Sequence, residues 1–150
     1  MRISIGTDHA GFRVKEAIKS FLMQKGYKVI DNGTYSEDSV DYPDFAKKVA
    51  QDILNNEADY GILLCGTGIG MSIAANKFKG IKAALCLLPK MASLSKMHND
   101  ANVLVLPGRL IGIDLALWIV EAFLESEFEG GRHEERVKKI EEFENHENCL

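Results

Sequence analysis

Residues 60–75 read YGILLCGTGIGMSIAA, and this stretch decides the fold. Its first six residues are mostly apolar, which is typical of a buried strand. A glycine-rich turn follows, and the residues after Gly70 predict a helix. A buried strand that passes directly into a helix is the repeating unit of parallel α/β sheets.

The same pattern recurs along the chain. Four further apolar runs, near residues 3, 29, 84 and 104, predict strands, so we expect five in all. Amphipathic helical patterns lie between them: Val14 to Leu22 before a stop at Gly26, a helix that begins near Pro43, and residues 89–98 and 112–125. Strict alternation of strands and helices predicts right-handed crossovers and a three-layer α/β/α sandwich with a five-stranded parallel sheet. No linker or repeat divides residues 1–150, so we expect a single domain.

The C-terminal part carries a different kind of helix. After Gly130 and Gly131 comes RHEERVKKIEEFE, whose only apolar stripe is Val137, Ile140 and Phe143. So thin a face predicts a helical arm, over about residues 130–145, that packs across another surface. Residues 112–125 are apolar around most of the helix, which predicts burial in the core or against another subunit. The tail after Phe143 suggests no role.

Composition excludes several classes of function. The formal charge of −4 over 150 residues disfavours nucleic-acid binding, which requires clustered Lys and Arg. No segment approaches the roughly 20 apolar residues of a membrane span. The three cysteines, Cys65, Cys86 and Cys149, leave one thiol unpaired and lack the spacing of a zinc site, which favours a reducing, cytoplasmic setting. Cys86, in an apolar run, is expected to be a small buried hydrophobe.

The loop after Cys65 has the features of an anion site, because glycines allow close approach and the helix start offers free N–H groups. It is not a nucleotide P-loop, since no Lys follows before Lys77, and a phosphatase loop would need Arg in place of Met71. Nor does the first strand end in a dinucleotide fingerprint.

A thiol beside backbone donors can act as a base that takes a proton from carbon, with the loop N–H groups and Thr67 stabilising the enediolate. The alternative is a simple turn with a buried cysteine.

Other polar residues follow the predicted strands and helices, and each has a structural alternative. Asp8 and His9 follow the first strand and face the same crevice, although Asp8 can also cap a helix. His98 ends the fourth helix, where it can complement the helix dipole. Arg109 follows the fifth strand. Arg132 and Arg136 are four residues apart, on one helical face, where two guanidinium groups suit a phosphate, although they can also form surface ion pairs with Glu135 or its neighbours.

With these residues taken together, the chain closely resembles the B-type ribose-5-phosphate isomerase family, which includes galactose-6-phosphate isomerase subunits. The resemblance covers essentially the whole chain. It rests on GTDHAGF from residue 6, DYPDFA from 41, CGTGIGMSIAANK from 65, HNDANVL from 98, the PGR that ends at Arg109, and the Arg132 and Arg136 pair.

The resemblance implies a Rossmann-like homodimer that interconverts ribose 5-phosphate and ribulose 5-phosphate without metal or cofactor. It implies that Cys65 moves the proton through a cis-enediolate and that His98 opens the sugar ring. The loop of Gly66, Thr67, Gly68 and Gly70 would stabilise the oxyanion. Sugar hydroxyls would be bound by Asp8 and Asn99, with Tyr42 lining the pocket, and the phosphate by His9, Arg109, Arg132 and Arg136.

Family precedent also places His98 and some of the arginines in the partner subunit's half of the site. Some family members use a glutamate in the loop as the base, but this chain has no carboxylate from Gly66 to Ala75.

Two alternatives remain open on these residues. The same groups can serve a hexose 6-phosphate, such as allose or galactose 6-phosphate, or a sensor that binds a sugar phosphate without turnover. Further pairing of dimers into a tetramer is likewise left open.

Overall fold

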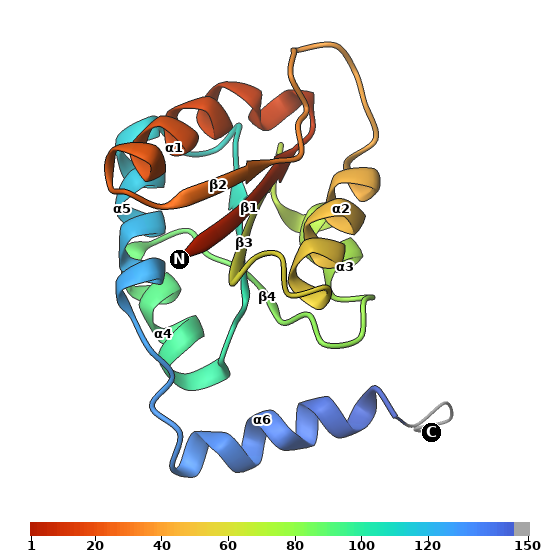
Figure 1. Ribbon diagram of the computed structural model, residues 1–150, viewed down its shortest axis with the longest axis vertical. Helices are drawn as coiled ribbons and strands as arrows, with labels where there is room; N and C mark the ends of the chain where they lie inside the picture. Colours follow the sequence, from red (N-terminus) through yellow and green to blue (C-terminus); the bar gives the residue numbers. More distant parts are fainter. Residues whose placement is uncertain (146–150) are drawn as a thin grey trace.

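A five-stranded parallel sheet forms the centre of the computed structural model, which describes residues 1–145 (Figure 1). Its strand order is β2-β1-β3-β5-β4. The strands are β1 (Arg2–Thr7), β2 (Lys28–Asp31), β3 (Tyr60–Cys65), β4 (Ala83–Leu85) and β5 (Val103–Pro107). Every pair of neighbouring strands is parallel, which confirms the predicted α/β class and all five predicted strands.

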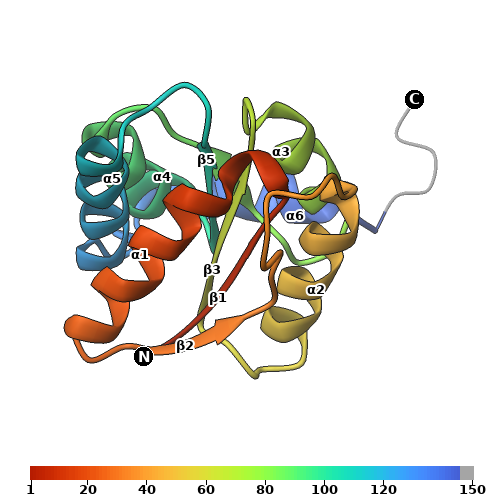
Figure 2. The same ribbon diagram turned by 90° about the horizontal axis from the view of Figure 1, so that it is seen from above.

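Helices cover both faces of the sheet (Figure 2). One layer holds α1 (Phe12–Gln24), α4 (Pro89–Asn99) and α5 (Ile113–Glu125), and the other holds α2 (Tyr42–Leu54) and α3 (Ile69–Ala75). A short 3-10 turn, η1 (His9–Gly11), leads into α1. The predicted three-layer sandwich is therefore confirmed.

The alternation of side chains along each strand divides the core between the two layers. In β3, Ile62 and Leu64 pack on the side of α1 and α5, whereas Leu63 and Cys65 pack on the side of α2 and α3. Successive strand residues point to opposite faces, and both faces of this sheet are covered, so the strands are apolar throughout. This is why the strands appear in the sequence as continuous apolar runs.

Local chemistry sets the helix ends as predicted. The cap of α1 is at Lys25, and Gly26 follows with a φ of 87°, a left-handed conformation that favours glycine. Pro43 lies in the first turn of α2, where its missing N–H has no partner to lose.

Helix α6 (Arg132–Phe143) lies apart from the two layers, at the edge where the strands begin (Figure 1). Of its apolar stripe only Val137 is buried. Its far end is tied to the residues before β4, since Lys82 pairs with Glu141 at 3.0 Å and the Gly80 N–H donates to Glu144. The predicted helical arm is present.

Helix α5 is buried only on its inner side. Ala116, Ile119 and Phe123 lie in the core, but Trp118 is 60% exposed. The core of the single chain therefore does not bury this helix all round, and burial of its outer side against another subunit stays a prediction. No helix within residues 1–145 is long and apolar enough to cross a membrane. Cys149 lies outside the described residues.

Candidate active site

The carboxyl ends of β1, β3 and β5 bring three loops together, because these strands are neighbours in the sheet. The loops are joined by backbone hydrogen bonds from Asp8 N–H to the Leu64 carbonyl, Gly108 N–H to Cys65, and Arg109 N–H to Gly66. Ligands of open parallel sheets bind beyond this edge. The predicted residues of the first, third and fifth loops therefore share one site.

Cys65 is the last residue of β3 and is 5% exposed. Its Sγ accepts a hydrogen bond from the Gly68 N–H at 3.2 Å. Gly68 has a φ of 77°, and a side chain there would meet Leu85 Cδ1 at 2.5 Å. The tight turn that presents an N–H to the sulfur therefore requires glycine at position 68.

The loop after Cys65 also leaves donors unused. The Thr67 hydroxyl accepts from the Ile69 N–H at 3.2 Å. Within residues 1–145, the N–H groups of Thr67 and Gly70 donate to no other residue. Free N–H groups at a helix start attract anions.

Two side chains from other elements lie against this loop. A Cβ at Gly70 would lie 2.5 Å from the ring of Tyr42, and a Cβ at Gly66 would lie 3.2 Å from the Arg109 guanidinium. Tyr42 and Arg109 therefore flank the Cys65 loop, and their roles as pocket wall and phosphate ligand stay predictions.

Asp8 and His9 are held by local hydrogen bonds. The Asp8 carboxylate accepts from the Ala10 N–H at 2.9 Å and so caps η1, which is the structural alternative raised for this residue. His9 Nδ1 accepts from the Val40 N–H at 3.2 Å, which leaves its other ring nitrogen as the donor. The role of Val40 was not anticipated, since backbone donors carry no sequence signal.

The remaining predicted residues, His98, Asn99, Arg132 and Arg136, lie at the opposite edge of the sheet. Helix α4 begins after the carboxyl end of β4 and returns to the start of β5 over a length of about 16 Å. His98 and Asn99 belong to that last turn, and both arginines belong to α6. One chain therefore does not bring the two groups together.

His98 stacks on a residue that the sequence did not single out. The rings of His98 and His133 have centroids 4.1 Å apart and planes 11° apart. Desolvation lowers the pKa of His133, and the charge that His98 can carry acts in the same direction. Sequence reasoning missed His133 because only the approach of α6 to α4 gives it a partner.

The two arginines of α6 are exposed, and no ion pair within residues 1–145 involves either of them. Acidic neighbours are nevertheless close in sequence, and one of them, Glu134, pairs with Lys138 at 3.6 Å. The alternative reading of the arginines as surface ion pairs finds no support among these residues.

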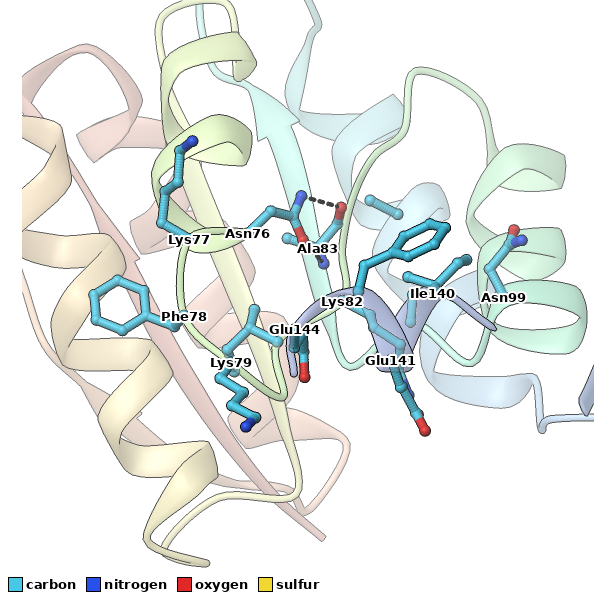
Figure 3. A pocket seen from close by; sticks show the side chains of 14 residues that line it. Asn76, Lys77, Phe78, Lys79, Lys82, Ala83, Asn99, Ile140, Glu141 and Glu144 are labelled. Atoms are coloured by element: carbon cyan, nitrogen blue, oxygen red, sulfur yellow. Dashed lines mark hydrogen bonds and ion pairs between the residues drawn. The ribbon is translucent and has the colours of Figure 1, made fainter. Parts of the chain in front are cut away.

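A hollow of about 650 Å³ lies beneath α6 at the same edge. Figure 3 shows residues that line it, among them Asn99 from α4, Ile140 from α6 and Ala83 from β4. Phe78, Ala101 and Phe143 add apolar surface. Cys65 does not line this hollow, so the hollow lies apart from the Cys65 loop.

The second described thiol has a different environment. Cys86 is 2% exposed, and burial raises the pKa of its thiol, with a hydrogen bond from Ser95 offsetting this in part. A protonated, buried thiol is unreactive, as expected for Cys86.

The chain is similar in sequence to a known family over most of its length. The Ribose/Galactose Isomerase family model matches residues 3–140. The chain is 48% identical to ribose-5-phosphate isomerase B of Escherichia coli K12 over 147 residues, which covers 98% of this chain and 99% of that protein.

Solved structures extend the similarity to the whole fold. A ribose 5-phosphate isomerase from Thermotoga maritima is 65% identical, with a TM-score of 0.92 over 94% of this chain and 97% of that one. The ribose-5-phosphate isomerase B of Mycoplasma genitalium with bound ribulose-5-phosphate is 44% identical, with a TM-score of 0.91 over 96% of each chain.

Proposed function

This chain belongs to the ribose/galactose isomerase family, and from that premise we propose that it interconverts ribose 5-phosphate and ribulose 5-phosphate through a cis-enediolate. The observation that carries the proposal is the Cys65 sulfur, held beside an N–H donor at the carboxyl edge of the sheet and next to further free donors.

Cys65 acts as the base that moves a proton between C1 and C2 of the open-chain sugar. The hydrogen bond from Gly68 to the sulfur strengthens when the sulfur is charged, because charge-assisted hydrogen bonds are stronger than neutral ones. Cys65 is only 5% exposed, so the substrate must approach this residue closely to reach the sulfur.

The oxyanion of the enediolate binds to the loop itself. Thr67 offers its hydroxyl and N–H, and Gly70 its N–H, and donors fixed before the reaction stabilise charge as it develops. Gly66 and Gly68 provide the close approach. Asp8 binds a sugar hydroxyl, Tyr42 closes one wall, and His9 and Arg109 bind the phosphate.

The partner subunit supplies the rest of the site. We infer a homodimer in which His98 opens the furanose ring, Asn99 binds a hydroxyl and Arg132 and Arg136 bind the phosphate, all in the neighbour's site. One feature of the single chain supports this: the four residues lie at the edge of the sheet opposite to Cys65. In a two-fold dimer, a contact between one copy's carboxyl edge and the other's α4 and α6 would occur twice and complete both sites.

Exposed apolar side chains at both edges fit such a contact. Ile69 and Ile73 of α3 and Leu88 before α4 are 55–58% exposed beside the Cys65 loop. Ile140 and Phe143 of α6 are exposed beside Asn99, where the hollow lies. Apolar patches of this kind mark interaction sites.

The free thiols of Cys65 and Cys86 support a reducing, cytoplasmic setting for this enzyme.

The test compares kcat/KM on ribose 5-phosphate with that on allose 6-phosphate and galactose 6-phosphate, alongside exchange in deuterated water. We expect the pentose phosphate to be preferred and label to appear at the carbon next to the carbonyl. A higher kcat/KM on a hexose phosphate would show that the substrate is a hexose 6-phosphate. Binding of a sugar phosphate without incorporation of deuterium would show that the protein is a sensor.

A further inference from the structure

Three possible metal ligands meet at the junction of α4 and α6. They are His98 in the last turn of α4, Glu129 in the segment after α5, and His133 in the first turn of α6, and their ligand atoms all lie within 4.8 Å of one another. The proposed isomerase reaction uses His98 but has no need of Glu129 or His133.

Backbone hydrogen bonds hold these residues together. The Glu129 N–H donates to the Met97 carbonyl at 3.0 Å, next to His98, and the His133 N–H donates to Gly130 at 3.1 Å. His133 is only 8% exposed. The main chain therefore fixes Glu129 and His133 close to the last turn of α4, which carries His98.

The distances are close to those of a metal site. Zinc bonds of about 2.0–2.1 Å in a tetrahedron place ligand atoms about 3.3 Å apart. His133 Nε2 and Glu129 Oε2 are 3.6 Å apart already. His98 lies parallel to His133, so its ring must turn out of the stack to aim a lone pair at the same point. His98 is half-buried, which leaves its ring room to turn.

We propose that His98, Glu129 and His133 bind a divalent transition metal, Zn²⁺ foremost, and that the bound metal inhibits the enzyme by withdrawing His98 from ring opening. The inhibition rests on the function proposed above, whereas the binding does not. Two imidazoles and a carboxylate with an open fourth position are a typical zinc donor set, while Mg²⁺ and Ca²⁺ prefer all-oxygen sites. Glu129 supplies the negative charge that offsets the nearby Arg132 and Arg136.

Binding is tested with Zn²⁺ itself, in competition with a chromogenic chelator. The measurement uses a Cys65→Ala background, which removes the active-site thiol as a competing Zn²⁺ ligand. In that background we expect His133→Ala and Glu129→Gln each to weaken Zn²⁺ binding by about tenfold or more. Glu134→Gln, an exposed neighbour on α6, is the matched control and should change nothing. Equal Zn²⁺ affinity with and without His133 and Glu129 overturns the site.

Glu129→Gln keeps the test decisive if His133→Ala fails to fold, because Glu129 is half-exposed. With Cys65 intact, the Glu129→Gln enzyme should keep its basal activity and require about tenfold more Zn²⁺ for half inhibition. Equal sensitivity to Zn²⁺ overturns the inhibitory role. If Zn²⁺ binds at these residues but the protein has no isomerase activity, the metal site stands and the proposed function is wrong. If the protein is an active isomerase but Zn²⁺ does not bind at these residues, the proposed function stands and the metal site is wrong.

Discussion

Individual residues of the Cys65 loop are constrained by space as much as by chemistry. Gly68 needs a left-handed φ, and Gly70 lies directly beneath the Tyr42 ring. The loop therefore holds the sulfur, the free N–H groups and the aromatic wall in one fixed arrangement. Small changes here are expected to affect catalysis directly.

Replacing Cys65 with Ala removes the proposed base. We expect kcat to fall by about 10²- to 10⁴-fold, the usual contribution of an acid-base group, while binding of ribose 5-phosphate changes little. Calorimetry measures the binding and a coupled assay the turnover. Turnover near that of the unmodified enzyme would rule out Cys65 as the base.

Replacing Gly70 with Ala forces a Cβ to within 2.5–2.8 Å of the Tyr42 ring. We expect a loss of about 1–3 kcal/mol in the free energy of unfolding, together with a lower kcat/KM. Gly112→Ala measures a helix-cap effect alone, because nothing lies within 4 Å of a Cβ there and only the preference of an N-cap for Gly over Ala, about 0.5–1 kcal/mol, is lost. Urea denaturation compares the two variants, and equal effects would mean that Tyr42 moves aside freely.

At the scale of elements, α4 carries a buried lysine that lies against aromatic rings. Lys96 is 3% exposed, and its Nζ lies 3.9 Å from the Tyr60 ring centroid and 5.0 Å from that of Phe123. Burial lowers its pKa to about 8, against 10.5 for the free side chain. The aromatic faces favour the cation and offset part of this desolvation cost.

The sign of its effect on stability follows from these two pKa values. Below about pH 8 the folded protein bears the full cost of a buried charge. Between about pH 8 and 10.5 the folded protein releases the Lys96 proton while the unfolded chain still binds it. The cost of burying the charge therefore disappears over this range, and the free energy of unfolding increases. The shift corresponds to at most about 3 kcal/mol, which cation–π contacts and residual solvent reduce to about 1–2 kcal/mol.

We therefore expect Lys96→Met to raise the free energy of unfolding by about 1–2 kcal/mol at pH 7 and to have no such effect near pH 10.5. Lys90→Met, in the exposed first turn of the same helix, is the control and should change stability by less than about 0.5 kcal/mol. Urea denaturation at both pH values measures the difference. A gain that persists at high pH would contradict the electrostatic cause.

At the scale of the whole molecule, the two halves of the proposed site lie at opposite edges of one sheet. Cys65 and Thr67 follow β3, whereas His98 ends α4 and Arg136 lies on α6. In the proposed homodimer, the second copy unites them. This division makes the dimer testable by activity alone.

Cys65→Ala and His98→Asn should each be inactive, but a mixed dimer contains one intact site. After unfolding and refolding an equal mixture, half of the dimers are mixed, so we expect about a quarter of the activity of the unmodified enzyme. Cys65→Ala mixed with Thr67→Ala is the control and should recover nothing, because both residues lie in the same half. No recovery in the first mixture would contradict a site shared between subunits.

The sequence by itself was sufficient for the five strands, the helices between them and the parallel α/β class. Those features follow from local periodicity and from glycine and proline at helix ends, and neighbours along the chain determine them. The residues of the Cys65 loop could be predicted for the same reason, since strand, turn and helix start are contiguous.

The tertiary structure alone decided the strand order, the contacts of Tyr42 with Gly70 and of His133 with His98, and the exposure of Trp118. It also separated His98, Asn99, Arg132 and Arg136 from the other site residues. These facts depend on which elements lie side by side and on the direction in which each helix runs. Segments distant in the chain determine them through packing, which leaves no local pattern in the sequence.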